Sequence, residues 1–75
     1  MEYIYKVTYR YKYGEKPWEC RDTIEGYWKD LETARAWVRG ALGGESAMND
    51  EWGFDIWTSP RHPRTEMFIE KIELR

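Results

Sequence analysis

The chain has little of what catalytic and metal sites are usually built from. Its 75 residues include one cysteine, one histidine and two serines. Cys20 has no partner for an intramolecular disulfide, and a zinc cluster or a nucleophilic triad needs more of these side chains than are present. His62 lies between Arg61 and Pro63 in a segment expected to be a loop. We therefore expect no enzyme activity, no metal and no other cofactor.

Long apolar runs and a basic surplus are also missing. No run approaches the roughly 18 residues that span a bilayer, and residues 1–15 lack the apolar stretch of a signal peptide. A lone cysteine gives no sign of an oxidising compartment, so we expect a cytoplasmic protein without a membrane partner. The net charge of −2, from 12 basic and 14 acidic residues, argues against general affinity for nucleic acid.

Large aromatic side chains are abundant. The chain carries five tryptophans, six tyrosines and two phenylalanines. A chain of this length has room for one core, and each buried aromatic removes roughly 150–250 Å² from water. We expect residues 1–75 to form a single compact domain whose core depends on these rings.

The first half of the chain predicts a β-hairpin. Residues 3–13 alternate between a face of tyrosines with Val7 and a more polar face, which is typical of a strand with one buried side. A four-residue loop would pair Tyr13 with Trp18 and continue into a second strand ending at Trp28. That register places Cys20 on the buried face and sets Arg10 opposite Arg21.

A helix and two more strands complete the expected fold. Asp30 is a suitable N-cap, apolar side chains recur at helical spacing over residues 31–42, and Gly43 follows. Residues 45–51 are expected to be a polar loop, and residues 52–57 a strand with Trp52, Phe54 and Ile56 inward and Trp57 outward. Residues 67–74 break strict alternation, so they form either a central strand covered on both faces or a bulged strand, and their apolar content favours the central place.

These elements predict an α+β fold of ββαββ order, with one helix packed on a four-stranded sheet. If the first and last strands are neighbours in the centre, the strand order is 2-1-4-3, as in β-grasp domains. An antiparallel 2-1-3-4 sheet is the alternative. Neither arrangement implies a function.

The outer face of the hairpin is the first candidate binding surface. Like charges directly opposite each other in a sheet are destabilising, so the pair of Arg10 and Arg21 has no evident structural purpose. Together with Lys12, these side chains could hold a carboxylate or phosphate of a partner. The alternative is that acidic neighbours such as Glu19 and Glu70 neutralise them.

Two further surfaces follow from chain length and loop composition. A helix of 12 residues is about 18 Å long and the strand over residues 3–13 about 36 Å, so Tyr13 and Trp18 should stand exposed at the hairpin end. The alternative is an aromatic cluster that only stabilises the hairpin. Residues 58–64, with Arg61, Arg64 and the adjacent Trp57, form the third candidate, or else a plain solvated connection.

Three functions remain open. The first is a non-catalytic protein interaction module that blocks a larger protein partner, since small aromatic-rich chains are typical of phage and mobile-element accessory proteins, including inhibitors such as anti-CRISPR proteins. The second is a single-stranded nucleic-acid-binding module that uses the aromatic and basic side chains of the hairpin. The third is a structural subunit of a homo-oligomer, with an edge strand or the outer sheet face as its interface. The chain would act as a monomer or a homodimer.

Overall fold

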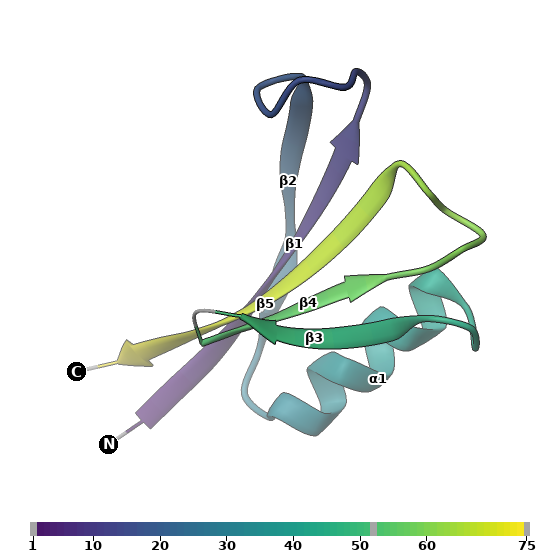
Figure 1. Ribbon diagram of the computed structural model, residues 1–75. Helices are drawn as coiled ribbons and strands as arrows, with labels where there is room; N and C mark the ends of the chain where they lie inside the picture. The colour runs from purple at the N-terminus through teal and green to yellow at the C-terminus, as the bar shows by residue number, and fades with distance from the viewer. Residues whose placement is uncertain (1, 52, 75) are drawn as a thin grey trace.

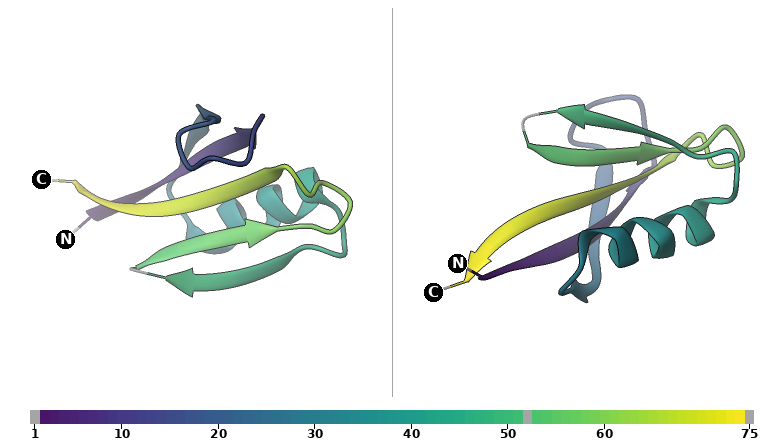
Figure 2. Two further views of the ribbon diagram at one scale, coloured as in Figure 1. Left: turned by 45° about the horizontal axis from the view of Figure 1, so that its top comes forward. Right: turned by 90° about the horizontal axis from the view of Figure 1, so that it is seen from below.

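The computed structural model describes residues 2–51 and 53–74, which form one helix and five strands (Figure 1). The strands are β1 (Glu2–Lys12), β2 (Cys20–Trp28), β3 (Ala47–Glu51), β4 (Phe54–Thr58) and β5 (Thr65–Leu74). The helix α1 (Leu31–Leu42) covers one face of the sheet, as Figure 2 shows from two further directions. The α+β class is therefore confirmed.

The sheet has the order β2-β1-β5-β4-β3, and every pair of neighbours is antiparallel. The prediction of four strands is wrong, because part of the expected polar loop over 45–51 forms β3. This strand pairs only with β4 at the edge of the sheet, where polar side chains reach water. Trp52, the expected start of the next strand, lies outside the described residues.

The first and last strands lie side by side in the centre of the sheet, as the predicted order 2-1-4-3 required. The alternative order 2-1-3-4 is wrong. With four strands the central pair would run parallel, as in β-grasp domains. The additional strand reverses the direction in which the last strand, β5, runs, so that β1 and β5 are antiparallel over ten residue pairs. The prediction that residues 67–74 form a central strand is therefore confirmed.

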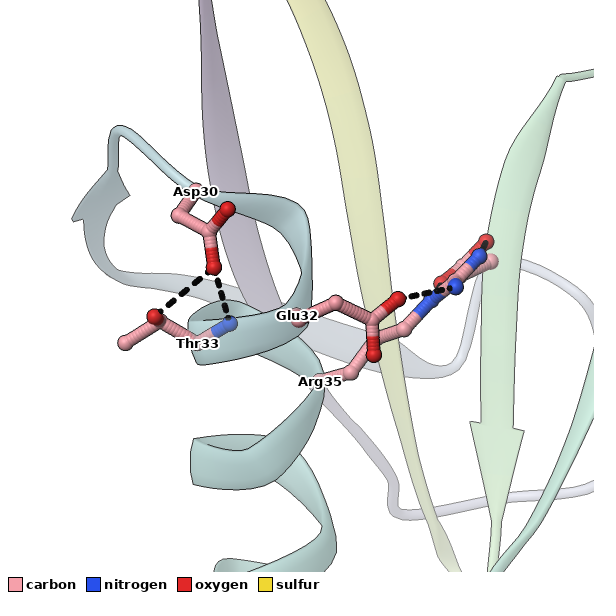
Figure 3. Close-up of polar contacts among 5 residues, drawn as sticks. Asp30, Glu32, Thr33 and Arg35 are labelled. Atoms are coloured by element: carbon pink, nitrogen blue, oxygen red, sulfur yellow. Dashed lines mark hydrogen bonds and ion pairs between the residues drawn. The ribbon is translucent and has the colours of Figure 1, made fainter.

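The helix has the predicted bounds and the predicted cap. The carboxylate of Asp30 accepts hydrogen bonds from the backbone N–H and the hydroxyl of Thr33, both at 2.9 Å (Figure 3). At the other end Gly43 has a φ of 98°, a left-handed value that favours glycine, and its N–H donates to the carbonyl of Arg39 at 2.8 Å. The helix packs on the sheet through Ala34, Val38 and Leu42.

The hairpin register differs from the predicted one. The connection between β1 and β2 spans seven residues, 13–19, and is closed by a bond from the N–H of Tyr13 to the carbonyl of Glu19 at 3.0 Å. Arg10 consequently lies opposite Asp22 instead of Arg21. A further irregularity between Val7 and Thr8 shifts the base of the hairpin by another residue. Because side chains alternate between faces, the first slip exchanges the two faces of β2 over Cys20–Ile24, and the second restores the predicted faces over Gly26–Trp28.

The orientation of β4 is also the reverse of the predicted one. Trp57 is 3% exposed and belongs to the core, together with Val7, Met67 and Ile69. Phe54 and Ile56 point to the face that the helix does not cover. The expectation that Trp57 points outward is therefore wrong, since β4 instead presents Trp57 and Asp55 to the helix side.

Candidate functional site

The hairpin formed by β1 and β2 extends beyond the end of the helix (Figure 1). We call residues 11–21 the hairpin tip. Its aromatic side chains are exposed: Tyr11 by 43%, Tyr13 by 57% and Trp18 by 71%. This agrees with the expectation that a helix of 12 residues is too short to cover the whole tyrosine face of β1.

Hydrogen bonds within the tip hold its backbone in one conformation. The carbonyl of Glu19 accepts from the N–H groups of Tyr13 and Gly14 at 3.0 and 3.3 Å, and the N–H of Glu19 donates to the carbonyl of Lys16 at 2.9 Å. The Glu19 carboxylate in turn accepts from the N–H of Lys16 at 3.3 Å. It packs so closely on Gly14 that a Cβ there would collide with it. The tip is therefore a preformed turn, with the Lys16 ammonium 5.4 Å from the centre of the Trp18 ring.

The loop over residues 59–64 lies beside the base of the tip. The N–H of Lys12 donates to the carbonyl of Arg64 at 2.7 Å, which joins the start of β5 to the end of β1. The hairpin tip and this loop, which are two of the three predicted binding surfaces, are thus adjacent. The Lys12 side chain forms an ion pair with Glu66 at 2.9 Å, so it contributes no free charge to this surface.

The loop itself is ordered by short-range bonds. Ser59 is buried, its carbonyl accepts from the N–H of His62 at 3.1 Å, and the carbonyl of His62 accepts from the N–H of Thr65 at 3.0 Å. Arg61 and Arg64 are exposed. Arg61 lies 3.7 Å from a carboxylate oxygen of Glu45, while Arg64 forms no ion pair within the described part of the chain.

The like-charge pair of Arg10 and Arg21 does not exist. Arg10 makes a two-pronged hydrogen bond to the carboxylate of Asp22, at 2.7 and 2.9 Å, and its guanidinium also lies 4.7 Å from the centre of the Phe68 ring. This bond lowers the pKa of the Asp22 carboxyl and raises the pKa of Arg10. Arg21 lies on the opposite face, across from Tyr11, where it is exposed. The two arginines therefore form no shared anion site, because they lie on opposite faces and Asp22 neutralises Arg10.

The same change of register moves Cys20. We expected it on the buried face beside Tyr11, but it lies across from Lys12 and is half-buried. Its sulfur is 3.5 Å from the carbonyl of Pro17. The expectation of a buried core thiol is wrong.

A charged contact between the helix and β4 was missed. Arg35 of the helix donates hydrogen bonds to Asp55 at 2.6 and 3.3 Å and to Glu32 at 2.9 Å (Figure 3). The hydrogen bond to Asp55 raises the pKa of the Arg35 guanidinium. Asp55 is only 8% exposed, so this contact allows a carboxylate to lie next to the core.

The face of the sheet opposite the helix carries a shallow groove of about 400 Å³. We call this face the open face. Apolar side chains from β2, β4 and β5 line the groove, namely Ile24, Phe54, Ile56 and Phe68. Sequence reasoning missed it because it assigned these side chains of β2 and β4 to the core.

The comparisons with known proteins found no relative. No family model matches the chain, and no curated protein or solved structure matches it. Across residues 2–51 and 53–74, no three His, Cys, Asp or Glu side chains lie together as a metal site would require. The helix in this part of the chain is too short to cross a bilayer.

Proposed function

We propose that the protein is a non-catalytic interaction module that docks its hairpin tip on a larger protein partner. The observation that carries this proposal is the exposure of Tyr11, Tyr13 and Trp18 on a preformed turn beyond the reach of the helix. Tyrosine and tryptophan are the side chains most enriched among the residues that dominate binding energy at protein interfaces.

The hydrogen bonds of the tip support this role. Association is opposed by the entropy lost when loops and side chains become ordered at the interface. The bonds from Tyr13 and Gly14 to Glu19 already order the backbone that carries Trp18. A partner would therefore gain contact with the rings without having to order a flexible loop.

Charge indicates what kind of partner surface would fit. Arg21 and Arg64 are exposed near the tip and form no ion pair within the described residues. Both guanidinium groups are thus available to carboxylates of a partner, and such pairs mainly determine specificity and the rate of association. The favoured partner surface combines an apolar pocket for an aromatic ring with an acidic rim.

The mode of action that follows is occupancy of the partner's surface. A module of this size that covers a functional surface of a larger protein would inhibit it, as small accessory proteins of phages and mobile elements do. Such an inhibitor needs no chemistry of its own, which suits a chain with one cysteine and one histidine.

The test compares tip variants with a matched control. Immobilised wild-type protein, the double variant Tyr13→Ala/Trp18→Ala and the control Tyr27→Ala are incubated with the same native lysate. Tyr27 is nearly as exposed as Tyr13, 53% against 57%, and lies on the same hairpin but at its other end. A partner recovered by the wild type and the control should be lost with the tip variant, with an affinity weakened by about 1–3 kcal/mol per ring. Equal recovery by all three proteins would contradict the proposal.

Single-stranded nucleic acid is the second candidate ligand. The position of the Lys16 ammonium over the Trp18 ring favours it, because single-strand binders combine stacking rings with nearby cations. Anisotropy of a fluorescent single-stranded oligonucleotide, titrated at several salt concentrations, tests this candidate. Phosphate contacts would make the affinity fall steeply with salt, and an absence of binding at low salt would exclude this ligand.

A further inference from the structure

The sheet is apolar on both faces, but the helix covers only one of them (Figure 2). Antiparallel sheets with one solvated face normally alternate apolar and polar side chains, with the polar ones in water. Here the open face instead presents an apolar set: Ile4, Ile24, Phe54, Ile56, Phe68 and Ile72. Ile24 is 53% exposed. The other five side chains are half-buried, and a contiguous, partly exposed apolar surface of this kind marks an interface.

Most charged side chains of the open face form pairs with one another, while Glu2 lies at the end of this face, opposite Leu74. Six charged side chains form three ion pairs across the strands: Lys6 with Glu70 at 3.4 Å, Arg10 with Asp22 at 2.7 Å, and Lys12 with Glu66 at 2.9 Å. The sum of these charges is zero, and both signs are interspersed. A surface that selects a different partner by charge carries an excess of one sign, whereas a surface that meets its own copy must not repel itself.

The size of the face also fits self-association. Five strands about 4.8 Å apart give a width of roughly 24 Å, and the lengths of the paired segments average about 25 Å. One copy thus offers roughly 600 Å², and two stacked copies would bury about 1,200 Å². This area is at the lower end of the range for specific protein interfaces.

We infer that the open face binds the open face of a second copy of this chain. The two sheets would stack about 10 Å apart around a twofold axis, with the helices on the outside. Phe68 would lie near the middle of the interface, because β5 is the central strand. This inference goes beyond the proposed function, since it uses a different surface and leaves the aromatic side chains of both hairpin tips free.

The modest area predicts a dimer of micromolar affinity that dissociates on dilution. Sedimentation equilibrium over micromolar to millimolar concentrations measures the association of the wild type and of the variants Ile24→Asp and Ile24→Lys. Both should weaken dimerisation at least about tenfold, because each places a charge in an apolar interface. Ile24 is exposed in the single chain, so both variants should keep the fold, as circular dichroism can verify.

The matched control is Tyr13→Asp, which introduces the same charge on an exposed side chain of the tip. It should leave the dimer unchanged while weakening the binding of a protein partner, whereas the Ile24 variants should do the reverse. A wild type that stays monomeric at millimolar concentration would overturn the inference. A dimer that persists in both Ile24 variants would also overturn it, and so would a dimer that is lost with only one of the two charges. The same holds if a captured protein partner is lost in the Ile24 variants but kept by Tyr13→Asp.

Discussion

Replacing Arg35 by alanine should destabilise the protein more than any other change on the exposed side of the helix. Asp55 is 8% exposed and its carboxylate takes two hydrogen bonds from Arg35, at 2.6 and 3.3 Å. Removing one partner of a buried ion pair costs about 3–5 kcal/mol, because the remaining charge is left unpaired in the interior. The Arg35 side chain keeps 27% of its exposure, so water can reach the vacated position. We therefore expect a loss of about 2–3 kcal/mol.

That loss is large for a domain of this size. At roughly 0.05–0.15 kcal/mol per residue, the free energy of unfolding would be about 4–11 kcal/mol. Urea denaturation followed by tryptophan fluorescence measures the change directly. With a slope near 1 kcal/mol per molar urea, the midpoint should fall by about 2–3 M.

Arg39→Ala is the matched control on the same helix. Its guanidinium lies 5.4 Å from the centre of the Trp57 ring, a contact worth about 0.5–1 kcal/mol at an exposed site. In addition, the double variant Arg35→Ala/Asp55→Ala removes both charges. Its free energy of unfolding should fall by less than the sum of the losses in the two single variants. If Arg35→Ala and Arg39→Ala lower the midpoint equally, Asp55 does not need its partner and the reasoning is wrong.

Four further substitutions test the core, the cap and an exposed ion pair, each by the midpoint of urea unfolding. Trp57→Ala should cost about 3–5 kcal/mol because that ring is buried, whereas Trp37→Ala should cost less than half as much because Trp37 is 39% exposed; equal losses would contradict the assigned core. Asp30→Ala should cost about 1 kcal/mol through loss of the helix cap, and an unchanged midpoint would show that the cap is dispensable. The bond from Arg10 lowers the pKa of Asp22, so its stabilisation is present above the carboxyl's ordinary pKa and disappears as the pH falls through the lowered one. Asp22→Asn should therefore cost less than about 1 kcal/mol at pH 7 and nothing in strong acid, and a difference that grows on acidification would refute this sign.

The elements governed by local sequence were predicted well. The helix has the predicted bounds because Asp30 and Gly43 satisfy its terminal backbone groups and its apolar spacing has a single phase. The exposure of Trp18 followed from a comparison of lengths, which depends only on the rise per residue of a helix and a strand. Neither result required knowledge of the partners of these side chains.

The errors share one physical cause. A strand can turn either of its two sets of alternate side chains toward the core. Local sequence does not select between these two orientations when both sets include apolar side chains. The orientation of β2 depends on how the turn closes at Glu19. The orientation of β4 depends on whether Asp55 finds a cation with which to form an ion pair. Arg35 supplies that cation from 20 residues away in the chain. Correct placement of Trp57 and Ile24 therefore required contacts that no short window of sequence contains.

The antiparallel pairing of β1 with β5 has a consequence for how fast the protein folds. Their ten residue pairs join positions from 54 apart, Tyr11 with Thr65, to 72 apart, Glu2 with Leu74. Closing such long loops costs entropy before the contacts can stabilise the chain, and proteins rich in distant contacts fold in milliseconds to seconds instead of microseconds. During synthesis on the ribosome, β1 can pair with β2 early but must wait for residues 65–74 before its second edge is satisfied. Until then an unpaired strand edge and the apolar side chain of Val7 are open to other chains, so assembly of this small domain should be sensitive to crowding and to chaperones.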